Sequence, residues 1–154
     1  MKPLVERVDA LLVPQLRRWS VPLLRMALGV VFVWFGALKT LDVSPVADLV
    51  ADTVYWVDPN WFVPLLGIAE MLIGIGLALG RGLRVVLLAL VGQMIGTFLV
   101  FIVLPDVAFQ HGNPLKLTVD GEFVVKNLVL LAAAFVVGAT VGDEDGEGGN
   151  PPAR

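Results

Sequence analysis

Four continuous apolar runs constrain this chain more than any other feature of its sequence. A run of about 18 or more apolar residues crosses a hydrocarbon core about 30 Å thick as an α-helix. Continuous runs also favour helices over the alternating strands of a membrane barrel, because helices bond their own backbone groups in lipid. We therefore predict an all-α fold, an integral membrane four-helix bundle. The expected spanning helices cover residues 21–41, 61–80, 83–104 and 123–140.

The composition excludes several other classes of protein. Of the 154 residues, 57% are hydrophobic and 16% are charged, whereas a soluble domain has about 45–50% apolar and about 25% charged residues. The formal net charge of −3 offers no basic surface for nucleic acid. The chain has no cysteine and one histidine. We therefore expect no disulfide, no thiolate nucleophile, no metal site and no intrinsic cofactor.

The first 20 residues precede the first run and are amphipathic. No small-residue cleavage site follows the first apolar run, so a secretory signal peptide is a poor interpretation. We predict a cytoplasmic interfacial amphipathic helix over residues 3–19, kinked at Pro14, with a solvated leader as the alternative. The expected organisation is an interfacial segment at 1–20, a four-helix domain at 21–140 and a disordered acidic tail at 141–154.

Lysine and arginine set the expected orientation in the membrane. They are concentrated before the first run and in the tight turn at Arg81 and Arg84, whereas the loop between the first two runs is acidic. Both termini should therefore be cytoplasmic.

Two loops carry local structural signals. Ser44 and Pro45 predict the start of a short helix that lies on the outer face of the bundle. Asp120-Gly121, between β-prone residues, predicts a β-hairpin turn. A simple turn leading into the fourth helix is the alternative.

Glu70 is the most informative polar residue within the runs. It lies nine residues after Trp61, about 13–14 Å along a helix axis, and so near the membrane midplane. Gln93 reaches a similar depth on the third run, and Thr97 shares its face one turn later. One interpretation is a carboxyl that carries a proton or binds a ligand, because ionisable groups in lipid are costly. The other is a neutral side chain that joins two helices through a hydrogen bond to Gln93 or a backbone carbonyl.

Two lysines lie on the outer side of this level. Lys39 closes the first run, and Lys126 lies in the first turn of the fourth, where the helix dipole disfavours a cation. Either can pair with Glu70, although Lys126 differs from it in depth by about six residues, or 9 Å. Each can instead extend to the lipid headgroups. Trp34 lies deep enough to line a pocket, with core packing as the alternative.

Pairs of glycines predict close helix packing, either within one bundle or in a homo-oligomer. The pairs are Gly29 and Gly36, Gly76 and Gly80, and Gly92 and Gly96.

Three segments of the chain resemble the DoxX family. They are Phe35-Gly-Ala-Leu-Lys39, Glu70 followed by Gly74, and Gly121-Glu-Phe-Val-Val-Lys-Asn127. The resemblance covers about residues 21–140 and implies a small four-helix protein of the bacterial or archaeal cytoplasmic membrane. The third segment adds Asn127 to the candidate cluster. The family name is linked to a thiosulfate:quinone oxidoreductase subunit, and this link implies a membrane oxidoreductase as partner.

These observations favour a subunit of, or partner to, a membrane oxidoreductase that binds a quinone among its helices. A quinone needs an apolar slot with polar groups for its carbonyl oxygens. No catalytic residue is assigned, so electron transfer would need the quinone itself or a partner subunit. The alternatives are a membrane scaffold or assembly factor and a proton-linked small-molecule transporter. The candidate ligand-binding residues are Glu70, Lys126, Lys39, Gln93, Thr97, Asn127 and Trp34.

Overall fold

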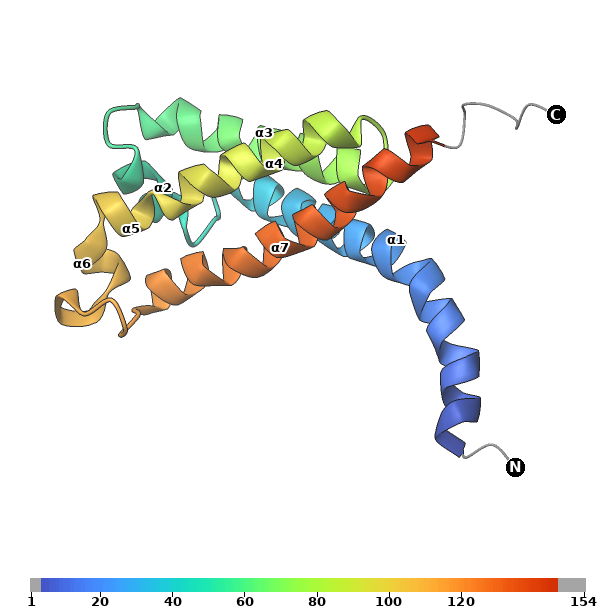
Figure 1. Ribbon diagram of the computed structural model, residues 1–154. Helices are drawn as coiled ribbons and strands as arrows, with labels where there is room; N and C mark the ends of the chain where they lie inside the picture. The colour runs from blue at the N-terminus through green and yellow to red at the C-terminus, as the bar shows by residue number, and fades with distance from the viewer. Residues whose placement is uncertain (1–3, 147–154) are drawn as a thin grey trace.

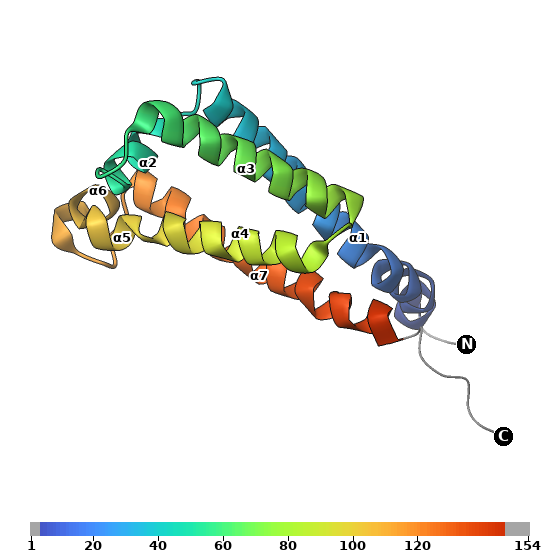
Figure 2. The ribbon, with the colours of Figure 1, turned by 90° about the horizontal axis from the view of Figure 1, so that it is seen from above.

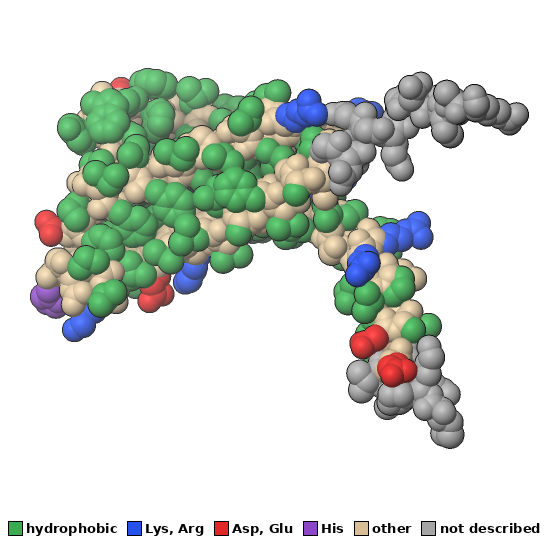
Figure 3. Space-filling view, viewed as in Figure 1, with side chains coloured by type: hydrophobic (Ala, Val, Ile, Leu, Met, Phe, Trp, Pro, Cys, Tyr) green, Lys and Arg blue, Asp and Glu red, His purple; other side chains and the backbone are tan. Residues whose placement is uncertain are grey.

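Four long helices form the bundle. The computed structural model describes the backbone of residues 4–146 and the side chains of Glu6 and residues 8–141. Within this part, four segments are long and apolar enough to span a membrane, and the all-α membrane bundle is confirmed. Hydrophobic side chains cover the flanks of the bundle in Figure 3, where lipid would lie. The helices are α1 (Leu4–Thr40), α3 (Pro59–Leu79), α4 (Leu83–Phe98) followed directly by α5 (Val100–Val103), and α7 (Val119–Gly146).

Helix α1 is longer than a membrane is thick. Its 37 residues extend about 55 Å at 1.5 Å per residue, against a hydrocarbon core of about 30 Å. Its N-terminal part bends away from the bundle (Figure 1). Pro14 and Pro22 lie inside the helix, and each removes a backbone hydrogen bond, which explains the bend. The interfacial segment and the first span, predicted as separate units, are thus parts of one bent helix.

Helices α1 and α3 are antiparallel and touch at two glycine pairs. A Cβ atom added to Gly29 would lie 2.8 Å from the carbonyl oxygen of Gly74, and one added to Gly67 would lie 2.5 Å from that of Gly36. These distances leave no room for a side chain, so the two backbones are in direct contact. On each helix the two glycines are seven residues apart and share one face. The predicted packing role of Gly29 and Gly36 is confirmed.

The other predicted glycine pairs behave differently. Gly76 accommodates the Val86 side chain of α4, 2.5 Å from where its Cβ would lie. Gly80 ends α3 in the left-handed conformation with φ +69°. A Cβ at Gly92 or Gly96 would meet nothing within 4 Å. Within the described chain, therefore, no helix packs on the Gly92–Gly96 pair.

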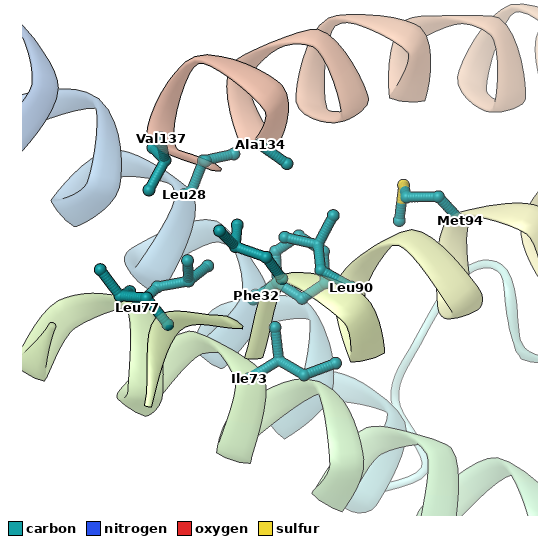
Figure 4. Packing of buried hydrophobic residues seen from close by; sticks show 10 residues of the cluster. Leu28, Phe32, Ile73, Leu77, Leu90, Met94, Ala134 and Val137 are labelled. Atoms are coloured by element: carbon teal, nitrogen blue, oxygen red, sulfur yellow. The ribbon is translucent and has the colours of Figure 1, made fainter. Parts of the chain in front are cut away.

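Buried apolar side chains from all four long helices fill the half of the bundle near the tight turn at residues 80–82. Helices α3 and α4 lie close together at this turn and diverge toward the opposite end (Figure 2). The core cluster therefore belongs to the narrow half of the bundle. Its labelled members in Figure 4 are Leu28, Phe32, Ile73, Leu77, Leu90, Met94, Ala134 and Val137.

Short elements cover the wide end of the bundle, called the α2 end below. They are α2 (Ala47–Thr53), α6 (Pro105–Ala108) and the 3₁₀ turn η1 (Gln110–Gly112). Helix α2 is the short helix predicted in the acidic loop. It begins later than predicted, because Val46 precedes it without a side-chain cap and the Ser44 carbonyl accepts a turn hydrogen bond from the Ala47 N–H.

The β-hairpin predicted at Asp120-Gly121 is wrong, and the alternative turn into the fourth helix is confirmed. These two residues lie in the first turn of α7. The Thr118 hydroxyl accepts a hydrogen bond from the Gly121 N–H at 3.1 Å and so caps the helix. The described chain contains one isolated bridge here, between Phe109 and Leu117.

Helix α7 continues to Gly146, past residue 141, where the acidic tail is predicted to begin. Residues 147–154 of that predicted tail lie outside the described residues.

Candidate functional site

A buried ion pair joins α1 to α3 in the wide half of the bundle. Lys39 Nζ lies 2.7 Å from Glu70 Oε2 and 2.9 Å from Glu70 Oε1. Lys39 is 6% exposed and Glu70 is 4% exposed. Buried charges persist when they are paired and hydrogen-bonded. The pairing of Lys39 with Glu70 therefore explains why both charges can be buried. Of the two lysines considered as partners of Glu70, the structure selects Lys39.

The glycine contact between α1 and α3 explains how Lys39 reaches the carboxylate. A Cβ added to Gly67 would lie 2.9 Å from Lys39 Cβ, so the two residues are at the same level. Glu70 follows Gly67 by about one helical turn. Because Gly67 has no side chain, the lysine stem can extend across α3 to Glu70. The close contact and the ion pair therefore depend on the same glycine.

Gln93 brings α4 into the cluster. Its Nε2 donates a hydrogen bond to Glu70 Oε1, which confirms the predicted contact between the two side chains. Since the amide nitrogen faces the carboxylate, the amide oxygen faces away from it. That oxygen is buried and has no hydrogen-bond partner among the described residues. An unpaired buried acceptor costs about 1–3 kcal/mol, so a donor from a bound molecule would relieve it.

The cluster forms the polar part of a cavity of about 170 Å³. Helices α1, α3, α4 and α7 supply its sides, and most of the lining is apolar. Its polar lining residues from the four long helices are Lys39, Glu70, Gln93, Thr97 and Asn127.

Thr97 and Asn127 each donate one hydrogen bond to a backbone carbonyl of their own helix. The Thr97 hydroxyl donates to the Gln93 backbone carbonyl at 3.2 Å. Asn127 is 8% exposed, and its Nδ2 donates to the Phe123 carbonyl at 3.4 Å, which is long for a hydrogen bond. The Asn127 amide is therefore available for a better acceptor.

Helix α2 covers the cavity. Val46, Leu49, Val50 and Thr53 face the cavity, while the acidic residues of α2, Asp48 and Asp52, are exposed. The helix is thus amphipathic across the cavity mouth, with its apolar face inward.

Two predicted site residues lie outside the cavity. The Lys126 side chain is 75% exposed and lies 3.7 Å from Glu122, one turn earlier on α7. Adjacent helical residues point about 100° apart, so α7 turns Asn127 inward and Lys126 outward. Trp34 is 66% exposed, because the α1 positions that face the bundle are Phe32, Gly36 and Lys39. It therefore neither lines the cavity nor packs in the core.

Thr53 was not among the predicted site residues, yet it is 4% exposed and lines the cavity. Its hydroxyl donates to the Leu49 carbonyl at 2.6 Å. The helical spacing of Val46, Leu49 and Thr53 contained the signal, since residues four and seven apart share a face.

The arrangement can hold one small molecule with a polar group. A dry apolar cavity of about 150 Å³ accepts a benzene ring, so a ring fits the volume found here. The lining offers donors from Lys39 and Asn127 and an acceptor from Gln93. The ion pair is neutral as a unit, so an uncharged ligand suits the site better than an ion. Among the described residues, no three His, Cys, Asp or Glu side chains are grouped to hold a metal ion.

A profile for the DoxX family matches residues 20–103, more than half of the chain. The chain belongs to the DoxX family. The match covers the bundle from α1 through α5, with Lys39, Glu70 and Gln93 inside it, and ends before α7 and Asn127. No curated protein and no solved structure matches the chain. DoxX membership and the four apolar helices make this a multi-pass membrane protein in contact with the lipid bilayer.

Proposed function

We propose that this DoxX-family protein binds a small uncharged ring compound in the cavity beneath α2, and that this compound is a quinone. The observation that carries the proposal is the cavity itself. Its walls are apolar, its volume of about 170 Å³ suits a single ring, and its hydrogen-bonding groups are gathered at Lys39, Glu70 and Gln93. This is the pattern expected of a site for an apolar ligand that is oriented by a few polar atoms.

The donors in the lining suit carbonyl oxygens. An ammonium group has three N–H donors, and the two hydrogen bonds of Lys39 within the described chain both go to Glu70. One donor is left for a ligand oxygen. The Asn127 amide, with its long hydrogen bond to Phe123, offers a second donor from the opposite helix. A quinone has two carbonyl oxygens across its ring and can accept from both, and the O–H groups of its reduced quinol form can donate to the unpaired Gln93 amide oxygen.

Electron transfer would require a second protein. The chain has no cysteine, and its histidine, His111, is exposed in the loop at the α2 end, away from the cavity residues. A chain of this kind supplies the quinone site, and a redox-active partner supplies or accepts the electrons. We therefore propose that the protein is a quinone-binding subunit of, or partner to, a membrane oxidoreductase.

The proposed location is the cytoplasmic membrane of a prokaryote, with both termini in the cytoplasm. Arg81 and Arg84 lie at the narrow end of the bundle, where α7 also ends, while Asp48 and Asp52 lie at the α2 end. Positive residues favour the cytoplasmic side, so α2 and the cavity belong to the outer half of the membrane.

Calorimetric titration tests the proposal directly. The purified chain in lipid nanodiscs is titrated with a short-chain benzoquinone, and we expect saturable binding at one site per chain. Lys39→Met should weaken binding about tenfold, because a charge-assisted hydrogen bond contributes about 1.5–3 kcal/mol. Asn127→Leu, which leaves the ion pair intact, should weaken it as well.

Lys126→Met is the matched control, because it removes a lysine from the same end of the bundle but outside the cavity. Its affinity should equal that of the native chain. Circular dichroism and thermal unfolding establish that each variant is folded. Absence of saturable heat from the native chain, or an equal loss in Lys126→Met and Asn127→Leu, would contradict the proposal.

A further inference from the structure

We propose that the ligand reaches the cavity sideways from the bilayer, through a slot between α3 and α4 beside Gly96, and that a hydrocarbon chain on the ligand remains in this slot. The inference rests on the proposed function, since it names the route and the class of ligand for the same cavity. The ligand would therefore be a ring compound with a lipid-like tail.

Helices α3 and α4 are in contact at one end and apart at the other. At the narrow end Val86 of α4 inserts over Gly76 of α3. Figure 2 shows the two helices diverging from there toward the α2 end. Ala69 on α3 lies two helical turns before Gly76, on the same face. Ala89 on α4 lies one turn after Val86. Both alanines are exposed, so at their level α3 and α4 are joined by the hydrogen bond from Gln93 to Glu70 and not by packing of these two faces.

Gly96 lies where the slot meets the cavity. It lines the cavity and it is also exposed, and a Cβ atom added to it would meet nothing within 4 Å. The wall of the cavity is therefore incomplete at this residue. Ala69 on α3 is exposed and lies outside the cavity lining, so a small side chain also borders the proposed slot on that helix.

The other sides of the cavity are covered by contacts between neighbouring elements. The backbones of α1 and α3 touch at Gly36 and Gly67, so nothing passes between these two helices. Between α1 and α7 the rings of Phe35 and Phe123, which both line the cavity, lie 6.2 Å apart, and α4 packs on α7 through the core cluster on the narrow side of the cavity. On the outer side α2 covers the cavity, and its Thr53 is 4% exposed. The opening beside Gly96 faces the flank of the bundle, where the solvent is lipid.

A tailed ligand follows from this geometry. The cavity of about 170 Å³ holds a ring but not a long chain. A chain attached to the ring must then leave the cavity, and the slot beside Gly96 leads it into the hydrocarbon phase. The tail would contribute to affinity by staying in contact with the exposed faces of α3 and α4.

Two probes and three variants test the route. The probes are one benzoquinone without a chain and the same ring with a decyl chain, titrated into the protein in nanodiscs. Ala69→Phe narrows the slot from α3, and Ala69 does not line the cavity; it should weaken binding of the decyl probe about tenfold or more, while the affinity for the tailless ring changes by less than about threefold. Gly96→Phe blocks the slot where it meets the cavity and should weaken binding of the decyl probe more than binding of the tailless ring.

Gly92→Phe is the matched control. Gly92 is on α4 one turn before Gly96, has equally open space around it and does not line the cavity. Its affinity for both probes should match that of the native chain. Native binding of both probes with no selective loss in Gly96→Phe and Ala69→Phe would overturn the route alone. Equal losses of both probes in these variants would also overturn it, since the head site would then be damaged. If the native chain binds neither probe, the proposed function fails and the route with it.

Discussion

Lys39 and Glu70 show how a membrane bundle can contain two charged side chains at a small net energetic cost. Each charge alone would be costly in the hydrocarbon region. Together, with Gln93 as an additional donor, they form a hydrogen-bonded unit without net charge. The glutamate thus joins three helices, through an ion pair to α1 and a hydrogen bond from α4.

Removing one member of the ion pair should destabilise the protein more than removing both members. We expect Glu70→Gln to lower the free energy of unfolding by about 3–5 kcal/mol, because it leaves the Lys39 charge buried and unpaired. The double variant Lys39→Met with Glu70→Leu should recover most of that loss, since neither charge then remains. Unfolding in mixed detergent micelles measures both.

The exposed pair between Lys126 and Glu122 is the control. Its separation of 3.7 Å and its exposed side chains place it among surface pairs, which contribute about 0–1 kcal/mol. A loss in Glu122→Gln as large as that in Glu70→Gln would show that burial is not what makes the inner pair important.

The sequence predicts the centre of the site better than its edges. Glu70 and Gln93 could be matched by depth alone, because α3 ends and α4 begins at the same tight turn. Lys126 and Asn127 could not both face inward, since neighbouring helical residues point in different directions. The choice between them depends on the rotation of α7, which is set by the buried residues Val124 and Ala134.

At the scale of elements, the α1–α3 pair is the most specifically packed part of the molecule. Gly29 and Gly36 meet Gly74 and Gly67 at matching intervals of seven residues. The interval is visible in the sequence of both helices, but its meaning depends on which helices are neighbours. A sequence search within one helix finds the first pair and leaves its partner unknown.

Gly67→Ala tests this contact. The added Cβ would lie 2.5 Å from the Gly36 carbonyl oxygen and 2.9 Å from Lys39 Cβ, so α1 and α3 must separate. We expect a loss of about 1–3 kcal/mol in unfolding free energy, measured in mixed micelles. Gly92→Ala, with nothing within 4 Å, should be neutral or stabilising by about 0.5–1 kcal/mol. Equal effects of the two substitutions would contradict the packing role of Gly67.

The N-terminal part of α1 should lie in the membrane interface. Leu12 and Leu16 are exposed and share one face of the helix with Trp19, whereas Ala10 lies on the opposite face. A nitroxide attached at Leu12→Cys should be more accessible to oxygen than to a polar nickel complex, and one at Ala10→Cys should show the reverse. High accessibility to the nickel complex at both positions would favour a solvated leader instead.

At the scale of the whole molecule, the number of spanning helices was predictable because lipid leaves the backbone few alternatives, whereas α1 and α7 extend beyond their predicted limits. The loops were less predictable. Asp120-Gly121 carries a hairpin signal, but the cap at Thr118 makes it the first turn of α7. The hydrogen bond that caps the helix at Thr118 outweighs the preference of Asp120-Gly121 for a hairpin turn.

The orientation can be tested without removing any native cysteine, since the chain has none. With the α2 end outside, Asp48→Cys should react with a membrane-impermeant maleimide in intact cells. Arg81→Cys should react only after the membrane is permeabilised. The opposite pattern would place α2 and the cavity on the cytoplasmic side.

The neutrality of the buried pair also has an electrical consequence. A net charge that crosses the whole membrane field experiences about 2.3 kcal/mol for each 100 mV, whereas a lysine and a carboxylate held 2.7 Å apart experience nearly cancelling forces. Occupancy by an uncharged ligand would then be independent of the membrane potential. The cavity would bind its ligand equally well in an energised and in a depolarised cell.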